Sequence, residues 1–482
     1  MIRKVLIANR GEIALRVARA CRELGLRSVA VYSTADAGSA VARAADEAVC
    51  IGPPPSKQSY QNAAAIVEAA RLTGADAVHP GYGFLSEDPD FAEICEAEGL
   101  VFVGPDPKVM SVLGDKASAR AIMREVGLPL LPGSVRTLGT STEAKRLADD
   151  VGYPVVIKAA AGGGGRGMTI VRGADDFAAA YIETQATAQA IFGDNRVYVE
   201  RYLEPARHVE VQFLCDRHGT GVHFGTRDCT VQRRHQKLVE EAPAPAVSPG
   251  VLEEMSVAAV RGAVSAGFSG AGTAEFLLAA DESYYFMEIN NRIQVEHPVT
   301  EMVTGVDLVQ EQLRIADGEP LRYRQEDVEP RGTAMECRVN AEDPDRQFAP
   351  TPGVLDACVL PAGPFTRVDS HVSPGDHIPP YYDSLVAKVA VWAPDRDAAV
   401  RRMERALAEC RVGGAGVKTT VPFLRRVLAD ARFRQCRHST ALADELLTAG
   451  PEAKPEAKSE ARSETRPEAK SETGRDTEGG GK

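Results

Sequence analysis

The segment at residues 292–301 holds side chains that could carry out acid–base chemistry on a small anion. It reads RIQVEHPVTE, and Arg292, Gln294 and Glu296 lie two residues apart in it. In an extended segment, side chains two residues apart point to the same side. An arginine can bind an oxyanion with paired hydrogen bonds, and a nearby glutamate can accept its proton. We therefore predict a site that binds a small oxyanion and deprotonates it.

Two glutamates upstream of this segment are candidate metal ligands. Residues 273–278 and 284–290 are expected to form a β-hairpin, and a loop at 280–283 would place Glu275 opposite Glu288. Facing carboxylates repel each other, and a divalent cation between them would remove that cost. Asn290 shares the face of Glu288, and oxygen ligands favour Mg²⁺ or Mn²⁺. The alternative is another hairpin register with both glutamates solvated; the neighbouring 292–296 segment favours the metal site.

A glycine run at residues 162–165 follows a strand-like segment that contains Lys158 and precedes another at residues 168–171. It lacks the lysine and the following helix of a Walker loop. A glycine-rich hairpin can instead bring backbone N–H groups close to phosphate oxygens, with Lys158 and Arg166 supplying charge. A flexible loop without a ligand is the alternative, and the adjacent strand lysine favours phosphate binding.

Two further segments are rich in polar donors. Residues 229–245 include Gln232, His235 and Lys237, which could line a phosphate or ribose site or could form a solvated face, and His208 and His235 could each be structural. Residues 336–340 alternate, so that Arg338 lies on the face opposite Cys337 and Val339. Arg338 could stabilise a developing oxyanion. A surface ion pair is the alternative for Arg338.

The composition bounds the class of protein. A chain of 482 residues predicts about three domains. A net charge of −12 and a pI of about 5.4 argue against non-specific nucleic-acid binding. No apolar run has the length of a membrane helix. The nine scattered cysteines are typical of a reduced, cytoplasmic protein.

The chain divides into segments of different character. Up to about residue 110, strand-like runs at 4–8, 28–32, 76–79 and 100–103 alternate with amphipathic helices. This alternation predicts a parallel, Rossmann-like sheet, although the first turn lacks GxGxxG. A second unit follows at about 115–203, then a strand-rich region to 446. From Pro451 the chain becomes a four-residue charged repeat, which we interpret as a disordered tail.

Together these residues resemble the biotin carboxylase family of ATP-grasp enzymes. The resemblance runs from about residue 2 to 446. The motifs QVEHPVTE and RRHQK are the most specific to this family. The matching segments, in family order, are IANRGEIA (7–14), HPGYGFLSE (79–87), GDKASAR (114–120), GGGGRGM (162–168), QRRHQKLVEEAPAP (232–245), QVEHPVTEM (294–302), ECRVNAEDP (336–344) and PPYYDS (379–384).

The resemblance implies an α/β chain of three domains and a tail. A Rossmann-like N-terminal domain is expected at 1–114, and an ATP-grasp domain with a mobile lid at about 131–203 is expected at 115–330. A biotin carboxylase C-terminal domain would occupy 331–446, and 447–482 would be the disordered charged repeat tail.

The resemblance also implies roles for individual residues. Bicarbonate would be bound by Arg292, Gln294 and the Val295 backbone, and Mg²⁺ or Mn²⁺ (two ions) by Glu275, Glu288 and Asn290. The catalytic residues would be Glu296 as the base, Arg292, Lys237, and Arg338 as the group that stabilises the biotin enolate. The residues that would bind ATP are Lys116, Lys158, Gly162, Gly163, Gly164, Gly165, Glu200, His208, Gln232 and His235.

The implied reaction is ATP-dependent carboxylation of biotin with bicarbonate, through carboxyphosphate. No methionine precedes a lysine, so the biotin carboxyl carrier protein is expected to be a separate partner. The chain also ends before there is room for a carboxyltransferase domain, so a separate carboxyltransferase is expected. A homodimer is expected, with Arg19 and Glu23 on its interface helix. The reaction is expected to be the first half-reaction of an acetyl-CoA (or acyl-CoA) carboxylase. The alternatives are another ATP-grasp carboxylate ligase, a component of propionyl-CoA or pyruvate carboxylase, and a non-catalytic assembly subunit.

Overall fold

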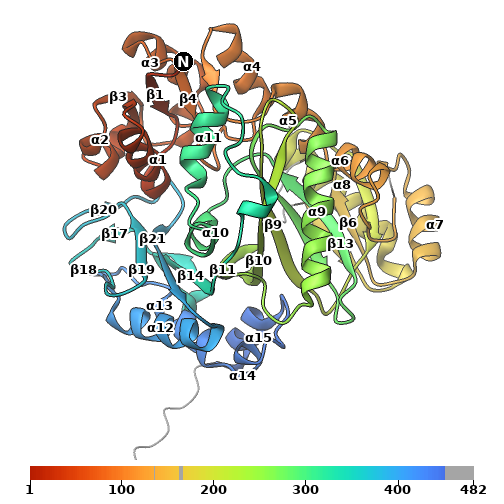
Figure 1. The fold of residues 1–482 in the computed structure, drawn as a ribbon. Helices are drawn as coiled ribbons and strands as arrows, with labels where there is room; N and C mark the ends of the chain where they lie inside the picture. Colours follow the sequence, from red (N-terminus) through yellow and green to blue (C-terminus); the bar gives the residue numbers. More distant parts are fainter. Residues whose placement is uncertain (135, 162–166, 451–482) are drawn as a thin grey trace, which may run out of the picture.

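The computed structural model describes residues 1–134, 136–161 and 167–450 of the chain (Figure 1). The elements follow the α/β order that the sequence predicts, with a parallel sheet first and a strand-rich region after it. In these described ranges, no helix is both long and apolar enough to cross a bilayer. All nine cysteines lie in the described part and are free.

The N-terminal unit is a five-stranded parallel sheet in the order β3-β2-β1-β4-β5. This confirms the predicted Rossmann-like sheet, because the predicted strands differ from the observed ones only at their ends. Its elements are β1 (Lys4–Ile7), α1 (Gly11–Glu23), β2 (Arg27–Ser33), α2 (Ala40–Ala44), β3 (Glu47–Gly52), α3 (Ala63–Thr73), β4 (Ala77–His79), α4 (Pro89–Ala97), β5 (Val101–Phe102) and α5 (Pro107–Gly114).

A small three-stranded antiparallel sheet, β7-β6-β8, forms a separate layer with two helices. Its apolar core includes Phe177 and Tyr181 of α8, which pack on the strands. The predicted hairpin between β6 and β7 is confirmed, whereas the glycines Gly162, Gly163, Gly164 and Gly165 at its turn lie outside the described residues. The elements here are α6 (Lys116–Glu125), α7 (Ser141–Val151), β6 (Val155–Ala159), β7 (Met168–Val171), α8 (Phe177–Phe192) and β8 (Val197–Arg201).

An eight-stranded antiparallel sheet, β13-β12-β9-β10-β11-β14-β21-β19, forms the centre of the molecule (Figure 1). It crosses the predicted domain boundary at residue 330, because β11 pairs with β14. Two regions that the sequence analysis separated therefore share one sheet. Its strands are β9 (Arg207–Cys215), β10 (Gly221–Arg233), β11 (Gln236–Ala242), β12 (Gly270–Leu278), β13 (Tyr284–Asn290), β14 (Thr333–Asn340), β19 (Thr366–Ser370) and β21 (Leu385–Ala393).

Alternation of side chains gives the two faces of this sheet different character. Val211 and Phe213 of β9 pack against α9 (Pro249–Ser265), and Cys337 and Val339 of β14 pack in the core that contains α12 (Arg396–Glu409). The residues that alternate with them on these strands, such as Glu210, Gln212 and Arg338, are polar and belong to the other face. The sheet therefore presents a polar face on which a site can be built.

The remaining elements lie between and after the later strands of the large sheet. The helices are α10 (His297–Thr304), α11 (Leu308–Ala316), α13 (Val421–Ala429), α14 (Ala431–Arg434) and α15 (Leu442–Ala449). The short strands are β15 (Glu342–Asp343), β16 (Ala349–Pro350), β17 (Gly353–Val354), β18 (Ala357–Val359), β20 (His377–Ile378) and β22 (Arg411–Gly413). Helix α15 corrects the predicted start of the tail at 447, because burial of Leu442 and Ala443 anchors a helix that ends at Ala449. Residues 451–482 lie outside the described ranges.

Phe213 tests the packing of the central sheet. Its ring is fully buried and contacts Phe268 edge-on, with ring centroids 5.2 Å apart. Phe213→Ala should lower the free energy of unfolding by about 3–5 kcal/mol, because it leaves a cavity under β9. Urea unfolding followed by circular dichroism measures the change. Ile182→Ala on the exposed side of α8 is the control, and an equal loss in both variants would contradict this packing.

Candidate active site

Four charged residues form a row across four neighbouring strands of the large sheet. Arg227 of β10 lies opposite Glu210 of β9, Glu210 lies opposite Glu275 of β12, and Glu275 lies opposite Glu288 of β13. The predicted pairing of Glu275 with Glu288 is therefore confirmed. Three carboxylates side by side across strands would destabilise the sheet unless cations offset them.

Lys237 supplies the central positive charge of this site. Its Nζ lies 2.6 Å from Glu210 Oε2, 3.1 Å from Glu275 Oε1 and 2.6 Å from Glu296 Oε1. Burial disfavours the ammonium, but the surrounding acidic groups outweigh burial and hold the pKa of Lys237 well above its usual value. The outer members of the row are also paired, because Arg227 Nε lies 2.5 Å from Glu210 Oε1 and Lys116 contacts Glu288.

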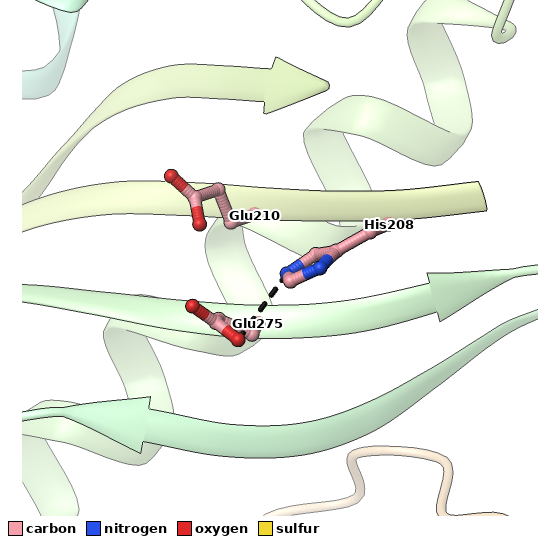
Figure 2. A group of neighbouring side chains, drawn as sticks. All are labelled: His208, Glu210 and Glu275. Carbon is pink, nitrogen blue, oxygen red and sulfur yellow. Dashed lines mark ion pairs between the residues drawn. The ribbon is translucent and has the colours of Figure 1, made fainter. Parts of the chain in front are cut away.

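Figure 2 shows His208, Glu210 and Glu275 turned toward one another from β9 and β12. One ligand atom from each lies within 4.8 Å of the others, so the group could hold a metal ion by distance alone. The ammonium of Lys237 already lies between the two glutamates, and His208 Nε2 lies 3.2 Å from Glu275 Oε2. Burial lowers the pKa of His208, yet Glu275 and Glu210 raise it above its usual value. The ammonium of Lys237 thus already offsets the negative charge of Glu210 and Glu275.

The segment after β13 does not continue as an extended strand. The chain bends at Asn291 and Arg292 and turns at Val295 and Glu296, and Glu296 is the N-cap of α10, so the predicted extended geometry is wrong. The side chains still converge. Arg292 donates to Gln294 Oε1 at 2.9 Å and to Asn290 Oδ1 at 3.2 Å. Gln294 Nε2 and Asn290 Nδ2 lie 3.3 and 3.0 Å from Glu275 Oε1, which joins this segment to the row of carboxylates.

Glu296 lies between two cations. Lys237 contacts one carboxylate oxygen, and Arg338 Nη2 donates to the other, Oε2, at 2.8 Å. Burial opposes ionisation of Glu296, but Lys237 and Arg338 outweigh it and hold its pKa well below the usual value. Arg338 is itself shared, because its Nε donates to Glu240 Oε1 at 2.6 Å. The surface ion pair considered for Arg338 is wrong, since both carboxylates are fully buried.

A second group of predicted residues lies on the small sheet. Lys158 of β6 contacts Glu200 of β8, and Arg120 of α6 donates to Glu200 Oε2 at 2.8 Å. The backbone N–H of Lys116 donates to Ala160 O at 3.4 Å, which ties the end of β6 to the start of α6 beside Glu288.

The β10–β11 hairpin carries the other predicted donors. Gln232 is buried, and its Nε2 lies 3.3 Å from His208 Nδ1. His235 is exposed at the turn, where Arg234 and His235 both have positive φ, 46° and 66°. Positive φ at both central residues is typical of a two-residue type I′ turn, which rarely contains such large side chains. His235 therefore lies exposed at the tip of this hairpin.

Sequence reasoning missed several residues that complete this geometry. Glu210 and Arg227 complete the row, Glu240 contacts Arg338, and Glu87 Oε2 lies 3.1 Å from Arg292 Nε. One signal was available for Glu210: His208, Glu210 and Gln212 alternate with Val209, Val211 and Phe213, the pattern of a strand with one polar face.

Comparisons with known proteins agree across the chain. Three family descriptions match: "Biotin carboxylase, N-terminal domain" at residues 1–110, "Carbamoyl-phosphate synthase L chain, ATP binding domain" at 115–324, and "Biotin carboxylase C-terminal domain" at 336–445. Biotin carboxylase from Nostoc sp. is 52% identical over 443 residues, which cover 92% of this chain and 99% of the relative. Biotin carboxylase 1 from Bacillus subtilis is 51% identical over 434 residues, which cover 90% of this chain and 96% of the relative.

A solved structure of similar fold contains ligands. It is the biotin carboxylase domain dimer of the Hydrogenobacter thermophilus 2-oxoglutarate carboxylase, in complex with magnesium ADP, ADP and bicarbonate. It has a TM-score of 0.89 and 46% identity to this chain, and the match covers 92% of this chain and 98% of that one. On the three consecutive domain matches and the half-identical full-length relatives, this chain belongs to the biotin carboxylase family.

Proposed function

We propose that this protein carboxylates biotin at the expense of ATP, with bicarbonate as the source of the carboxyl group. The observation that carries the proposal is the contact of Glu296 with both Lys237 and Arg338, beside Arg292 and Gln294 and next to a row of carboxylates. The closeness of these groups beside the polar face of the sheet supports a site with an anion-binding pair, a base and metal ligands. The bicarbonate and magnesium ADP bound by the Hydrogenobacter relative support the assignment.

Bicarbonate is proposed to bind between Arg292, Gln294 and the backbone N–H of Val295. Arg292 currently pairs with Glu87 through Nε and with Gln294 through Nη1. A guanidinium has five donor hydrogens, so Arg292 can keep one partner while it binds an anion. Glu296, which follows Val295 directly, can then face the same anion as the base.

The oxygen donors Glu275, Glu288 and Asn290 fit a divalent cation of the Mg²⁺ or Mn²⁺ type. The two carboxylates face each other, and the Asn290 amide lies within 3.0 Å of Glu275 Oε1. When bound, such an ion neutralises charge on phosphate oxygens. The lysines that now contact these carboxylates, Lys237 and Lys116, would turn toward the phosphates of ATP.

The remaining predicted residues are proposed to bind ATP. Lys116 and Lys158 supply cations, while Glu200, His208, Gln232 and His235 supply polar contacts on the two sheets. Burial disfavours the charge of Lys158, but Glu200 outweighs burial and raises the pKa of Lys158. The α7–α8 unit around the small sheet is proposed to be the lid, which would keep water from a labile intermediate.

In the proposed first step, Glu296 accepts the proton of bicarbonate, and a bicarbonate oxygen attacks the γ-phosphorus of ATP. The bond from the γ-phosphorus to the bridging oxygen breaks, so the products are ADP and carboxyphosphate. Carboxyphosphate then divides into CO₂ and phosphate, and the phosphate accepts the N1 proton of biotin. Arg338 stabilises the negative charge that develops on the ureido oxygen, and N1 attacks CO₂.

Glu240 competes with Glu296 for the hydrogen bonds that Arg338 donates. Burial raises the pKa of Glu240 to about 7, with Arg338 acting in the opposite direction and Glu296 adding to the rise. Near neutral pH Glu240 is therefore partly protonated. A protonated Glu240 has no negative charge, so its interaction with the Arg338 guanidinium is weaker. The N–H groups of Arg338 can then bind Glu296 or an oxyanion more strongly.

The proposed partners follow the family. The natural substrate is proposed to be biotin on a separate carrier protein, with a separate carboxyltransferase that determines the final acceptor. The alternatives for that acceptor are the acyl-CoA thioesters acetyl-CoA and propionyl-CoA, and pyruvate. A homodimer is proposed through α1, where Arg19 and Glu23 are exposed one turn apart and Glu23 accepts from Gln310 Nε2 at 2.7 Å. Analytical ultracentrifugation of the whole chain tests the dimer.

Release of ADP is the first test of the function. With ATP and Mg²⁺, turnover should require both bicarbonate and biotin, because the proposed site activates one to carboxylate the other. ADP is measured by a coupled assay with each substrate omitted in turn. Turnover that is unaffected by biotin would favour another ATP-grasp carboxylate ligase instead.

Glu296→Gln tests the base. The amide keeps the shape of the side chain but cannot accept the bicarbonate proton, so kcat should fall by about 100-fold or more. Steady-state ADP release measures the loss. Glu301→Gln is the matched control, because Glu301 lies in the same ten-residue segment but pairs with Arg16 and Arg367 outside the site. Full activity in the Glu296 variant would contradict its assignment.

The stability of the protein should depend on pH through Glu240. Its pKa is raised from 4.5 to about 7 in the folded chain, so folding retains a proton that the unfolded chain releases. This contribution favours the folded state below the unfolded pKa and is lost as pH rises through about 7. Glu240→Gln should therefore flatten the fall in Tm between about pH 5 and 8.

The measurement is thermal unfolding of both proteins across that range. Glu183→Gln, on the exposed side of α8, is the control for replacing a carboxyl group by an amide. Parallel Tm curves for the unmodified chain and the Glu240 variant would show that Glu240 gains no proton on folding.

A further inference from the structure

Lys388 is a lysine with no exposed surface that contacts three separate parts of the chain. It lies on β21, and its Nζ donates to the backbone carbonyl of Val295 at 2.8 Å. The same Nζ lies 3.1 Å from Glu12 Oε1 of α1 and 3.9 Å from Asp369 Oδ2 of β19. Fully buried lysines are rare unless they are paired, and Glu12 provides the counter-charge here.

The carbonyl that Lys388 contacts belongs to the peptide between Val295 and Glu296. The preceding carbonyl, Gln294 O, lies 2.7 Å from His297 Nδ1. Burial and the cations Lys388, Arg367 and Arg16 hold the pKa of His297 well below its usual value, so the ring is neutral and its Nδ1–H donates to this carbonyl. Both peptide groups that flank the Val295 α-carbon are therefore fixed by buried side chains.

Fixing these two carbonyls also fixes two N–H groups. Each peptide unit is planar, so the direction of its carbonyl sets the direction of its N–H. The His297 contact sets the direction of the Val295 N–H, and the Lys388 contact sets that of the Glu296 N–H. The Lys388 contact also sets where the Glu296 side chain leaves the backbone. Neither Lys388 nor His297 needs to touch a substrate to do this.

We propose that Lys388 is a positioning residue, which holds the peptide between Val295 and Glu296 so that the Glu296 carboxylate faces the bicarbonate bound at the Val295 N–H. This inference rests on the proposed function. Glu12 is its partner from the N-terminal unit, and the Glu12 carboxylate also accepts a hydrogen bond from the Tyr82 hydroxyl. The bicarbonate site is thus oriented by residues from the first and last thirds of the chain.

The test removes the contact without leaving a buried unpaired charge. Lys388→Met/Glu12→Gln replaces the buried ion pair by neutral side chains of similar size. Steady-state ADP release gives KM for bicarbonate and for ATP separately. The KM for bicarbonate should rise about tenfold, as expected for loss of a hydrogen bond from a charged donor, while the KM for ATP stays within about twofold.

A matched control removes a similar ion pair elsewhere. Arg396 of α12 contacts Glu241 at 2.7 and 2.9 Å, and Glu241 is as buried as Glu12. Arg396→Met/Glu241→Gln should lower the Tm without changing the KM for bicarbonate, because neither residue contacts the 292–296 segment. Lys388→Arg is the second test if the double variant does not fold: it keeps the charge but changes the donor geometry, so the KM for bicarbonate should still rise alone.

The outcomes separate this inference from the function on which it rests. A wild-type KM for bicarbonate in the double variant, or equal rises in both KM values, would overturn the positioning role and leave the proposed function intact. ADP release by the unmodified chain that needs no bicarbonate would overturn both. A selective rise in the KM for bicarbonate supports both.

Discussion

The site depends on the contact of one ammonium, that of Lys237, with three buried carboxylates. Glu210 and Glu275 lie side by side on neighbouring strands, and Glu296 approaches from the start of α10. Without a cation, these carboxylates would repel one another on a face that has little water to screen them. With Lys237 in place, they can lie close together in one small volume, where the proposed function needs a base, metal ligands and a phosphate-binding lysine.

The single large sheet explains how distant segments reach this volume. Strands β9, β12 and β13 carry the row of carboxylates, while β14 and β21, which belong to the same sheet, carry Arg338 and Lys388. Packing of α9 and α12 on the apolar face leaves the polar face free to meet the N-terminal unit. That unit adds Glu12 and Glu87, which contact Lys388 and Arg292. Division of the chain into successive domains hides the fact that the N-terminal unit and strands from both sides of residue 330 meet at these residues.

Much of this could be predicted from sequence because it rests on local patterns. Alternation placed Arg338 on the face opposite Cys337 and Val339, and the short loop at 280–283 fixed the pairing of Glu275 with Glu288. The contacts that could not be predicted join segments far apart in sequence. Nothing local pairs Glu12 with Lys388 or places Glu210 opposite Glu275, since those depend on the order of strands in the sheet. The turn before α10 was also missed, because Pro298 starts a helix where alternation suggested a strand.

The central claim is that this site activates bicarbonate by transferring the γ-phosphoryl group of ATP directly to it. Bicarbonate labelled with ¹⁸O tests this claim, with mass spectrometry of the inorganic phosphate released during biotin carboxylation. The account predicts one ¹⁸O atom in each phosphate, because the oxygen that attacks phosphorus stays with it when carboxyphosphate breaks down. Carboxylation of biotin with no label in the phosphate would contradict the account, since the phosphoryl group would then have been transferred to water.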